Sequence, residues 1–294
     1  MPWHELQINV TPNELTRIEA FLRLTGAEAI SLAGNDGHEI IEPAPGETVV
    51  WHSIRLTALF PPSTSINLIK DYLCTAAKIE GLITEHEVQE KDWLDGLKRR
   101  PSIQYIGKQL MLAPADSKLE YKNRTCVKLN LGLAFGTGEH PTTSLCLEWI
   151  DANLKPGSQV LDYGCGSGIL AISTLRLKAS QAWAVDIEPQ ALLATKDNAE
   201  LNGVEDRLWI GVPENLPNLQ VDLIVSNIIA GTLENLTEVF KQCLRPGGHL
   251  ILSGILESQV TKITRCYAKE FKAFTKQQKE GWVLLCAQRR KNLP

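Results

Sequence analysis

Val160-Leu-Asp-Tyr-Gly-Cys-Gly-Ser-Gly-Ile-Leu170 is the stretch that decides the fold of this 294-residue chain. A short apolar run ends in Asp162, three glycines follow at alternate positions, and an apolar helical pattern begins after them. This order predicts a strand, a glycine-rich turn and a helix. Glycine permits positive φ and lacks the Cβ that keeps a ligand from the backbone, and the next helix start offers unpaired N–H groups. We therefore expect a cofactor over this turn.

The spacing of the glycines narrows the class of cofactor. The dinucleotide fingerprint G-x-G-x-x-G, counted from Gly164, requires glycine or alanine at position 169, where this chain has Ile169. The form present is D-x-G-x-G-x-G, in which an acid precedes the loop. This form argues against a dehydrogenase and favours a ligand without phosphates. When the motif is considered alone, a turn that serves only the fold remains the alternative.

The composition is that of an ordinary globular protein, with 44% hydrophobic and 22% charged residues and a length that suggests two domains. The net charge of -4 gives no general attraction to nucleic acid, so we expect no direct sequence-specific binding to it. The run Lys98-Arg99-Arg100 is either a local basic patch or a solvated linker. The start resembles no signal peptide, and no apolar run reaches the ~18 residues of a membrane helix. We therefore expect a cytoplasmic protein without membrane contact.

The cysteines and histidines give no sign of a metal site or of disulfides. The seven cysteines are odd in number and never form a C-x-x-C pair, and the histidines are dispersed. We expect reduced core thiols and no metal.

The first ninety or so residues form a pattern of their own. Hydrophobic periodicity predicts strands at 4–10, 29–32, 49–60 and 84–89 and helices at 12–24 and 65–78. The order β-α-β-β-α-β is that of the ferredoxin-like α+β sandwich. Because it carries no glycine-rich ligand loop and no useful cluster of reactive side chains, we expect residues 1–92 to be a recognition domain. The change of composition over 93–102 predicts an interdomain linker.

The second domain is expected over residues 103–294. Segments 105–112 and 126–131 are predicted to pair as a hairpin that introduces it. A glycine-rich loop over 132–140 follows and leads into a helix that starts at Pro141, so the loop either covers a ligand or serves only as the turn into that helix.

From position 159 onward strands and helices alternate, which predicts a mostly parallel sheet with helices on both faces. An antiparallel pair around Gly281 is expected at one edge. The predicted strands are 160–162, 181–185, 208–212, 221–226 and 249–256, and the predicted helices are 169–177, 189–202, 233–244 and 260–267.

Ligands of open α/β sheets bind beyond the carboxyl ends of the strands, near the switch in strand order. Three features fall there: the turn at Gly164, Asp186 after the second strand, and Asn227 after the fourth. The separation 186 − 164 = 22 suits a carboxylate that accepts both ribose hydroxyls of a nucleoside. Considered alone, Asp186 also suits a helix cap.

Five stretches together resemble the methyltransferases that modify ribosomal large-subunit protein L-eleven, the PrmA family. The first motif is shared by many S-adenosylmethionine-dependent methyltransferases, whereas the glycine-rich loop that ends in His-Pro-Thr-Thr is far more particular to this family. The resemblance extends over nearly the whole chain. The stretches are 132–143 (GLAFGTGEHPTT), 162–172 (DYGCGSGILAI), 186–191 (DIEPQA), 197–204 (DNAELNGV) and 226–230 (SNIIA).

The resemblance implies a Rossmann-like class I methyltransferase domain after the ferredoxin-like domain. It implies methyl transfer from S-adenosylmethionine to lysine side chains and the N-terminal amine of protein L-eleven, free or in the ribosome. The ferredoxin-like domain would hold this substrate, and a monomer is expected. On matching positions the cofactor contacts are Thr143, Gly164, Gly166, Asp186 and Asn227.

Methyl transfer from a sulfonium needs alignment and a neutral amine. We expect Asn227 to be the catalytic residue that orients the amine, with loop 132–140 closing over both reactants. Glu139 and His140 are either proton acceptors or loop caps. The alternatives are a class I methyltransferase for another protein or a small-molecule amine, and a non-catalytic nucleoside-binding module. Ile228-Ile229 stands where Pro-Pro-aromatic would hold a planar amide, which argues against glutamine and nucleobase targets.

Overall fold

The computed structural model describes residues 3–35, 51, 53–75, 77, 83–88, 103–117, 123–130, 138 and 140–291. The chain divides into two compact units, Met1–Arg99 and Arg100–Pro294. The expected linker over 93–102 and most of the glycine-rich loop (131–137 and Glu139) lie outside the described residues. Within the described ranges, no helix is both long and apolar enough to span a membrane.

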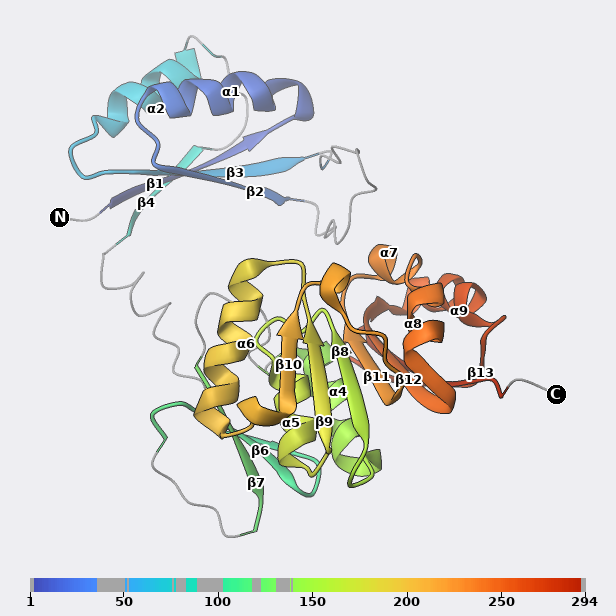
Figure 1. Cartoon of the computed structure of the whole chain (residues 1–294). Coiled ribbons are helices and arrows are strands. Elements are labelled where there is room, and N and C mark those ends of the chain that lie inside the picture. The colour runs from blue at the N-terminus through green and yellow to red at the C-terminus, as the bar shows by residue number, and fades with distance from the viewer. Residues whose placement is uncertain are drawn as a thin grey trace. The chain divides into compact units, whose positions relative to one another are not determined.

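The first unit is a four-stranded antiparallel sheet with two helices on one face (Figure 1). The strand order is β2-β3-β1-β4. This is the predicted β-α-β-β-α-β sandwich. Its elements are β1 (Trp3–Val10), α1 (Pro12–Leu24), β2 (Ala29–Gly34), β3 (Ile54–Phe60), α2 (Ile66–Thr75) and β4 (Ile83–Val88).

Strand alternation explains why only one face of this sheet is covered. Leu6 and Ile8 of β1 are fully buried on the helix side, whereas Gln7 between them is only partly buried. On β3, Arg55 likewise faces away from the helices and is exposed. The first unit therefore has its own core and one open sheet face.

The second unit is built on a seven-stranded sheet with the order β10-β9-β8-β11-β12-β14-β13. The first five strands in this order pair in parallel, and β14 runs antiparallel to both of its neighbours. The strand order reverses between β8 and β11. This is the predicted mostly parallel sheet with an antiparallel edge. The strands are β8 (Gln159–Tyr163), β9 (Gln181–Val185), β10 (Leu208–Gly211), β11 (Val221–Asn227), β12 (Leu244–Leu256), β13 (Phe271–Lys279) and β14 (Trp282–Arg289).

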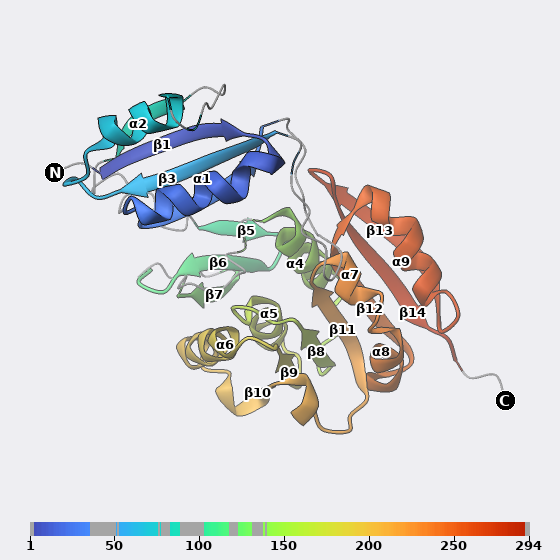
Figure 2. The same cartoon turned by 90° about the horizontal axis from the view of Figure 1, so that it is seen from above.

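Helices cover both faces of this sheet, as Figure 2 shows from above. One face carries α4 (Pro141–Asn153), α5 (Ile169–Arg176) and α6 (Pro189–Asn202). The other carries α7 (Ala230–Leu233), α8 (Thr237–Cys243) and α9 (Val260–Tyr267). Because both faces are covered, the central strands are apolar along almost their whole length.

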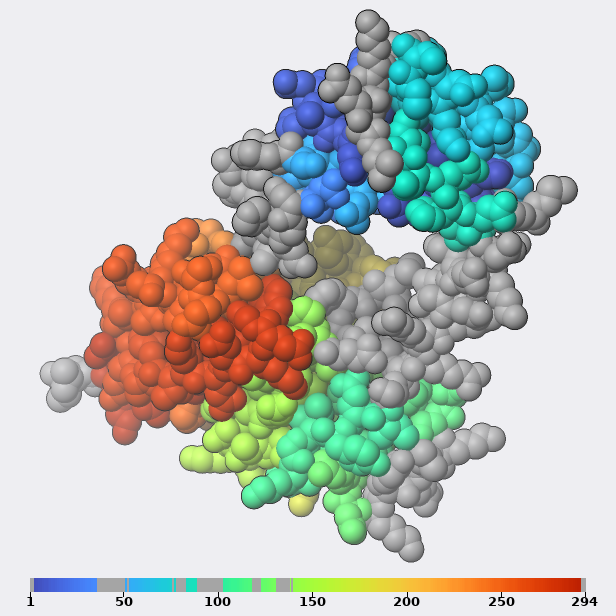
Figure 3. All heavy atoms as spheres, turned by 180° about the vertical axis from the view of Figure 1, so that it is seen from behind, coloured from blue at the N-terminus to red at the C-terminus, as the bar shows by residue number. Residues whose placement is uncertain are grey.

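A three-stranded sheet of β5 (Gln104–Ile106), β6 (Leu110–Pro114) and β7 (Thr125–Leu129) precedes the large sheet. The predicted hairpin between 105–112 and 126–131 is wrong, because β6 and β7 pair in parallel. The antiparallel hairpin is β5–β6, inside the first segment. Figure 3 shows this small sheet (green) and the C-terminal strands (red) on one face of the second unit.

A buried carboxylate on α4 is the reason for this tight hairpin. Asp151 accepts the backbone N–H groups of Lys108, Gln109 and Leu110 at 2.7 to 2.9 Å. Gly107 turns at φ +50°, and a Cβ there would lie 2.2 Å from the Asp151 carboxylate. The chain therefore reverses at 107–109, well before the predicted turn.

Three smaller predictions also differ from the structure. The helix predicted over 233–244 begins only at Thr237 (α8), and a separate short helix, α7, ends at Leu233, whose carbonyl accepts the hydroxyl of Tyr267 at 2.7 Å. The strand predicted from 249 begins at Leu244, and residues 245–248 form an irregularity in its pairing with β11. All seven cysteines are free, but only three of them are buried core thiols (Cys146, Cys165 and Cys243), and Cys74 is exposed.

Candidate active site

The strand register places the three predicted site segments next to one another. Tyr163 pairs with Val185, and Asp162 pairs with Val225, so the residues after β9, β8 and β11 emerge together at the carboxyl edge of the sheet. Gly164 thus has Asp186 on one side and Asn227 on the other. This is the edge at the switch in strand order, where open α/β sheets bind ligands.

The glycine turn is held by backbone bonds and by close packing. The N–H groups of Gly164 and Cys165 both donate to the carbonyl of Val185, at 2.7 and 3.0 Å. Gly164 has φ +83°, and a Cβ on it would lie 2.2 Å from Cγ2 of Ile228. A side chain at Gly164 would therefore displace both the glycine turn and the segment that follows Asn227.

Asp186 bonds to the glycine turn and to the start of the next helix. Its Oδ2 accepts the N–H of Gly166 at 2.9 Å, and its Oδ1 accepts the N–H of Glu188 at 3.0 Å. The N-cap of α6 is Glu188, so the second bond belongs to the turn before the helix and is not the helix cap considered from the sequence. Each carboxylate oxygen has a further lone pair, so the group can also accept hydroxyl donors from a ligand.

Thr143 and Asn227 form a second pair at the same edge. Thr143 is 1% exposed on α4, and its hydroxyl accepts the Asn227 amide Nδ2 at 3.2 Å. Among the described residues, Oδ1 of Asn227 has no hydrogen-bond partner. Thr143 therefore orients the Asn227 amide so that its oxygen is available as an acceptor.

His140 is the N-cap of α4, as one of the two sequence interpretations expects. Its Nδ1 accepts the backbone N–H of Thr142 at 3.3 Å. The imidazole also meets the Trp282 indole edge to face, with ring centroids 5.1 Å apart. Glu139, which the sequence offered together with His140 as a proton acceptor or a loop cap, lies outside the described residues.

Sequence reasoning missed a row of buried polar residues on α6. Thr195 donates to the carbonyl of Gly166 at 3.0 Å, and the Asn198 amide donates to the carbonyl of Ser167 at 2.9 Å. Asn198 also accepts the N–H of Asn130, at the start of the glycine-rich loop, at 2.8 Å. Their three-residue spacing puts both on one helix face, and polar residues repeated on a packed face were the signal available in the sequence.

Asp162, the acid of the first motif, is fully buried beneath the turn. Its Oδ2 accepts the N–H of Ala171 at 2.9 Å, which ties the end of β8 to the first turn of α5. Its Oδ1 has no partner among the described residues. Burial raises the pKa of Asp162 to about 7 against the opposing effect of the Ala171 bond, and the nearby Asp186 carboxylate adds to the rise.

The groups at this edge suit a nucleoside with a charged sulfur and an amino acid tail. The carboxylate of Asp186 can accept hydroxyls, the amide oxygen of Asn227 can accept amine hydrogens, and the turn exposes backbone without a Cβ at Gly164. These groups are therefore compatible with the hydroxyls and the amino group of S-adenosylmethionine.

Comparison with known proteins agrees with this site. The family model described as ribosomal protein L11 methyltransferase (PrmA) matches residues 2–290. A ribosomal protein L11 methyltransferase of Pasteurella multocida is 39% identical over 285 residues, which cover 96% of this chain and 97% of that protein. One from Actinobacillus pleuropneumoniae serotype 3 is 38% identical with the same coverage.

A solved structure gives the same result for part of the chain. The ribosomal protein L11 methylase of Lactobacillus delbrueckii subsp. bulgaricus superposes with a TM-score of 0.58 at 32% identity, covering 64% of this chain and 99% of that chain. With the family model matched almost from end to end, the chain belongs to the ribosomal protein L11 methyltransferase (PrmA) family and is an S-adenosylmethionine-dependent methyltransferase.

Proposed function

We propose that this protein methylates ribosomal protein L11 in the cytoplasm, acting as a monomer on lysine ε-amines and the N-terminal α-amine. The observation that carries the proposal is the strand register, which aligns Asp186, the Gly164 turn and Asn227 at one edge. Relatives at 39% and 38% identity, named for L11, support the choice of substrate.

In this proposal the cofactor is held by Asp186 and by the backbone of Gly164 and Gly166. The bound cofactor supplies an electrophilic methyl group on a sulfonium. The carboxylate of Asp186 accepts the ribose hydroxyls while it keeps its bonds to the N–H groups of Gly166 and Glu188. Asp162 acts below them by fixing the distance between β8 and α5.

Asn227 orients the amine that receives the methyl group. A free lysine has a pKa of about 10.4, so the site has to receive the amine and hold it without its extra proton. Oδ1 of Asn227 accepts one N–H of the amine, which directs the nitrogen lone pair away from the amide. Thr143 keeps the amide in that orientation through the 3.2 Å bond to Nδ2.

The first unit is proposed to bind the protein substrate through its open sheet face. Gln7 on β1 and Arg55 on β3 lie on that face, opposite the two helices. Extended backbone with polar side chains offers a broad surface for a protein partner, and neither residue belongs to the core of the unit.

Transfer of tritiated methyl groups to purified ribosomal proteins tests the proposal. We expect label in L11, a mass gain in steps of one methyl group by intact-mass spectrometry, and no label with Asp186→Ala. Asp206→Asn removes an exposed carboxylate on the same unit and is the matched control, with activity retained. Label only in a nucleic acid fraction, or in a protein other than L11, would overturn the substrate assignment.

A further inference from the structure

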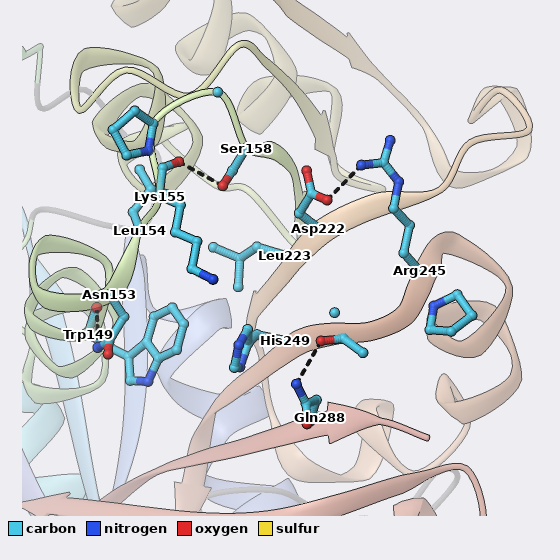
Figure 4. A pocket seen from close by; sticks show the side chains of 15 residues that line it. Trp149, Asn153, Leu154, Lys155, Ser158, Asp222, Leu223, Arg245, His249 and Gln288 are labelled. Atoms are coloured by element: carbon cyan, nitrogen blue, oxygen red, sulfur yellow. Dashed lines mark hydrogen bonds and ion pairs between the residues drawn. The ribbon is translucent and has the colours of Figure 1, made fainter. Parts of the chain in front are cut away.

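A cavity of about 580 Å³ lies at the opposite edge of the seven-stranded sheet from the candidate active site (Figure 4). It is lined where α4 ends and where β8, β11 and β12 begin. Its volume lies in the range of about 300 to 1,000 Å³ that is typical of small-molecule sites. We call it the amino-edge cavity and define it by Trp149, Lys155, Leu223, His249 and Gln288.

Two aromatic rings form one wall of the amino-edge cavity. The Trp149 and His249 rings have centroids 5.7 Å apart and are tilted by 53°. Trp149 is half-buried and packs against the core on the α4 side of the sheet, which restricts the motion of the indole. Burial, together with the nearby Lys155 ammonium, lowers the pKa of His249, so this ring is neutral at neutral pH. The wall therefore offers a fixed, uncharged surface to a flat ring.

The charged side chain of the cavity that has no partner among the described residues is that of Lys155, a cation. The Lys155 ammonium has no hydrogen bond or ion pair with the described residues, and Figure 4 shows its side chain extending between Leu223 and His249. The acid of the cavity is already neutralised, because Asp222 accepts Arg245 Nη1 at 2.6 Å and the N–H of Gln159 at 2.8 Å. The unpaired ammonium therefore favours an anionic ligand in this cavity.

An amide beside the rings supplies a hydrogen-bond acceptor. The Nε2 of Gln288 donates to the carbonyl of Gly247 at 2.8 Å, which orients the amide. Its oxygen has no partner among the described residues and is available to an exocyclic amino group. A flat ring with an amino group and an attached anion satisfies the wall, the amide and the cation together.

We propose that the amino-edge cavity binds a nucleotide, with the base against Trp149 and His249, its amino group at Gln288 and a phosphate at Lys155. This site is separate from the cofactor edge and does not depend on the proposed methyl acceptor. The nucleotide can be a free mononucleotide or a unit of a single RNA strand. In the second case Lys291, exposed just beyond β14, lies near Gly247 at the same edge and can meet a neighbouring phosphate.

Calorimetric titration of the full chain with cytidine monophosphate tests the proposal. S-adenosylhomocysteine is kept in excess so that the cofactor edge is filled. We expect saturable binding that weakens at least about tenfold in Lys155→Gln, the loss of one charge-assisted hydrogen bond. Lys196→Gln removes an exposed lysine of α6 outside the cavity and should leave binding unchanged. Methyl transfer by Lys155→Gln is expected to equal that of the wild type.

Two further ligands separate the parts of the proposal. Inorganic phosphate should bind more weakly than cytidine monophosphate, and equal affinity would overturn the role of the rings. An oligocytidylate of about six nucleotides that binds more tightly than the monophosphate, with the same dependence on Lys155, identifies an RNA strand as the source. The proposal is wrong if neither nucleotide ligand binds up to about 1 mM or if Lys155→Gln leaves their affinity unchanged.

Discussion

The two units bury their sheets in different ways, and the difference separates two kinds of function. The four-stranded sheet has helices on one face only, so its described strands alternate buried residues with residues that are half-buried or exposed. The seven-stranded sheet is covered on both faces, so only its edges are accessible. A covered sheet concentrates polar groups where its strands end, which suits chemistry on a small cofactor, whereas an open face suits a protein partner.

The largest effect is expected from the carboxylate at the edge of the covered sheet. Asp186→Ala should abolish measurable S-adenosylmethionine binding by calorimetry, because it removes the proposed ribose acceptor and the anchor of the Gly166 N–H. Glu85→Gln removes a carboxylate of the first unit that pairs with Lys70 at 2.9 Å. It should leave cofactor affinity unchanged. An Asp186→Ala protein that binds the cofactor like the wild type would contradict the site.

The pH dependence of stability should differ in sign between the two units. The pKa of Asp162 is raised from 3.8 to about 7 in the fold, so its contribution is complete below pH 4 and is lost as the pH rises to about 7. The free energy of unfolding should fall by a few kcal/mol over this window, and Asp162→Asn should remove that fall.

Glu85 of the first unit is the matched case of opposite sign. Its hydrogen bond from Lys70 lowers the pKa of Glu85, so its contribution is present above pH 4.5 and is lost as the pH falls. This effect is small because the group is near the surface. Urea unfolding of the wild type, Asp162→Asn and Glu85→Gln across the pH range measures both. Equal slopes for all three proteins would show that Asp162 titrates normally.

Loss of the Asn227 amide, which is proposed to orient the amine, should lower the turnover number, kcat. Asn227→Ala should lower kcat about 100-fold through loss of alignment, with a smaller loss, about tenfold, in Thr143→Val, where the amide stays but is no longer held. Steady-state kinetics with L11 checks this order. A Thr143→Val loss equal to that of Asn227→Ala would make the threonine a direct contact.

Two glycines with positive φ, one in each unit, compare a crowded turn with an open one. Gly164→Ala meets Ile228 at 2.2 Å, whereas Gly26→Ala, at φ +96°, meets nothing within 4 Å. Both should lose about 1 kcal/mol for the backbone conformation, and Gly164→Ala should lose a further 1 to 3 kcal/mol and its cofactor affinity. Thermal unfolding and calorimetry measure the two quantities. Equal stability losses would remove the steric part of the argument.

The smallest effect is expected on the open face of the first unit. Arg55→Glu should raise KM for L11 about fivefold and leave kcat and cofactor affinity unchanged, because a rim charge acts mainly on encounter with the partner. Arg23→Glu, on the helix side of the same unit, is the control. If Arg23→Glu alone raises KM, the helices and not the open face meet the substrate.

The local sequence was enough to predict the parts of the site that depend only on the spacing of residues along the chain. The turn at Gly164 and the acid at position 186 could be predicted because the strand, turn and helix follow one another directly along the chain. The direction of β7 could not be, since it depends on Asp151 holding a hairpin more than forty residues earlier. The end of α7 is likewise contacted from another element, because the hydroxyl of Tyr267 donates to the carbonyl of Leu233.

The buried polar residues of α6 are the second kind of feature that the sequence did not predict. The three-residue spacing of Thr195 and Asn198 marks one face of the helix, but it does not show that the glycine turn packs against that face. Asn198 bonds to Ser167 on one side and to Asn130 on the other, so its role is defined only once both segments are placed. Long-range packing, which periodicity does not encode, decides such positions.

A third polar residue on that face of α6, Asn202, bonds to a strand edge that could otherwise pair with another copy of the chain. β7 is an outer strand of the three-stranded sheet, and such a strand is a template for pairing with another chain. The amide of Asn202 accepts the N–H of Lys128 at 2.9 Å and donates to its carbonyl at 2.7 Å, as the peptide group of a neighbouring strand would. A helix side chain thus occupies the hydrogen-bonding groups of Lys128 that an added strand would use, which hinders strand addition at this edge.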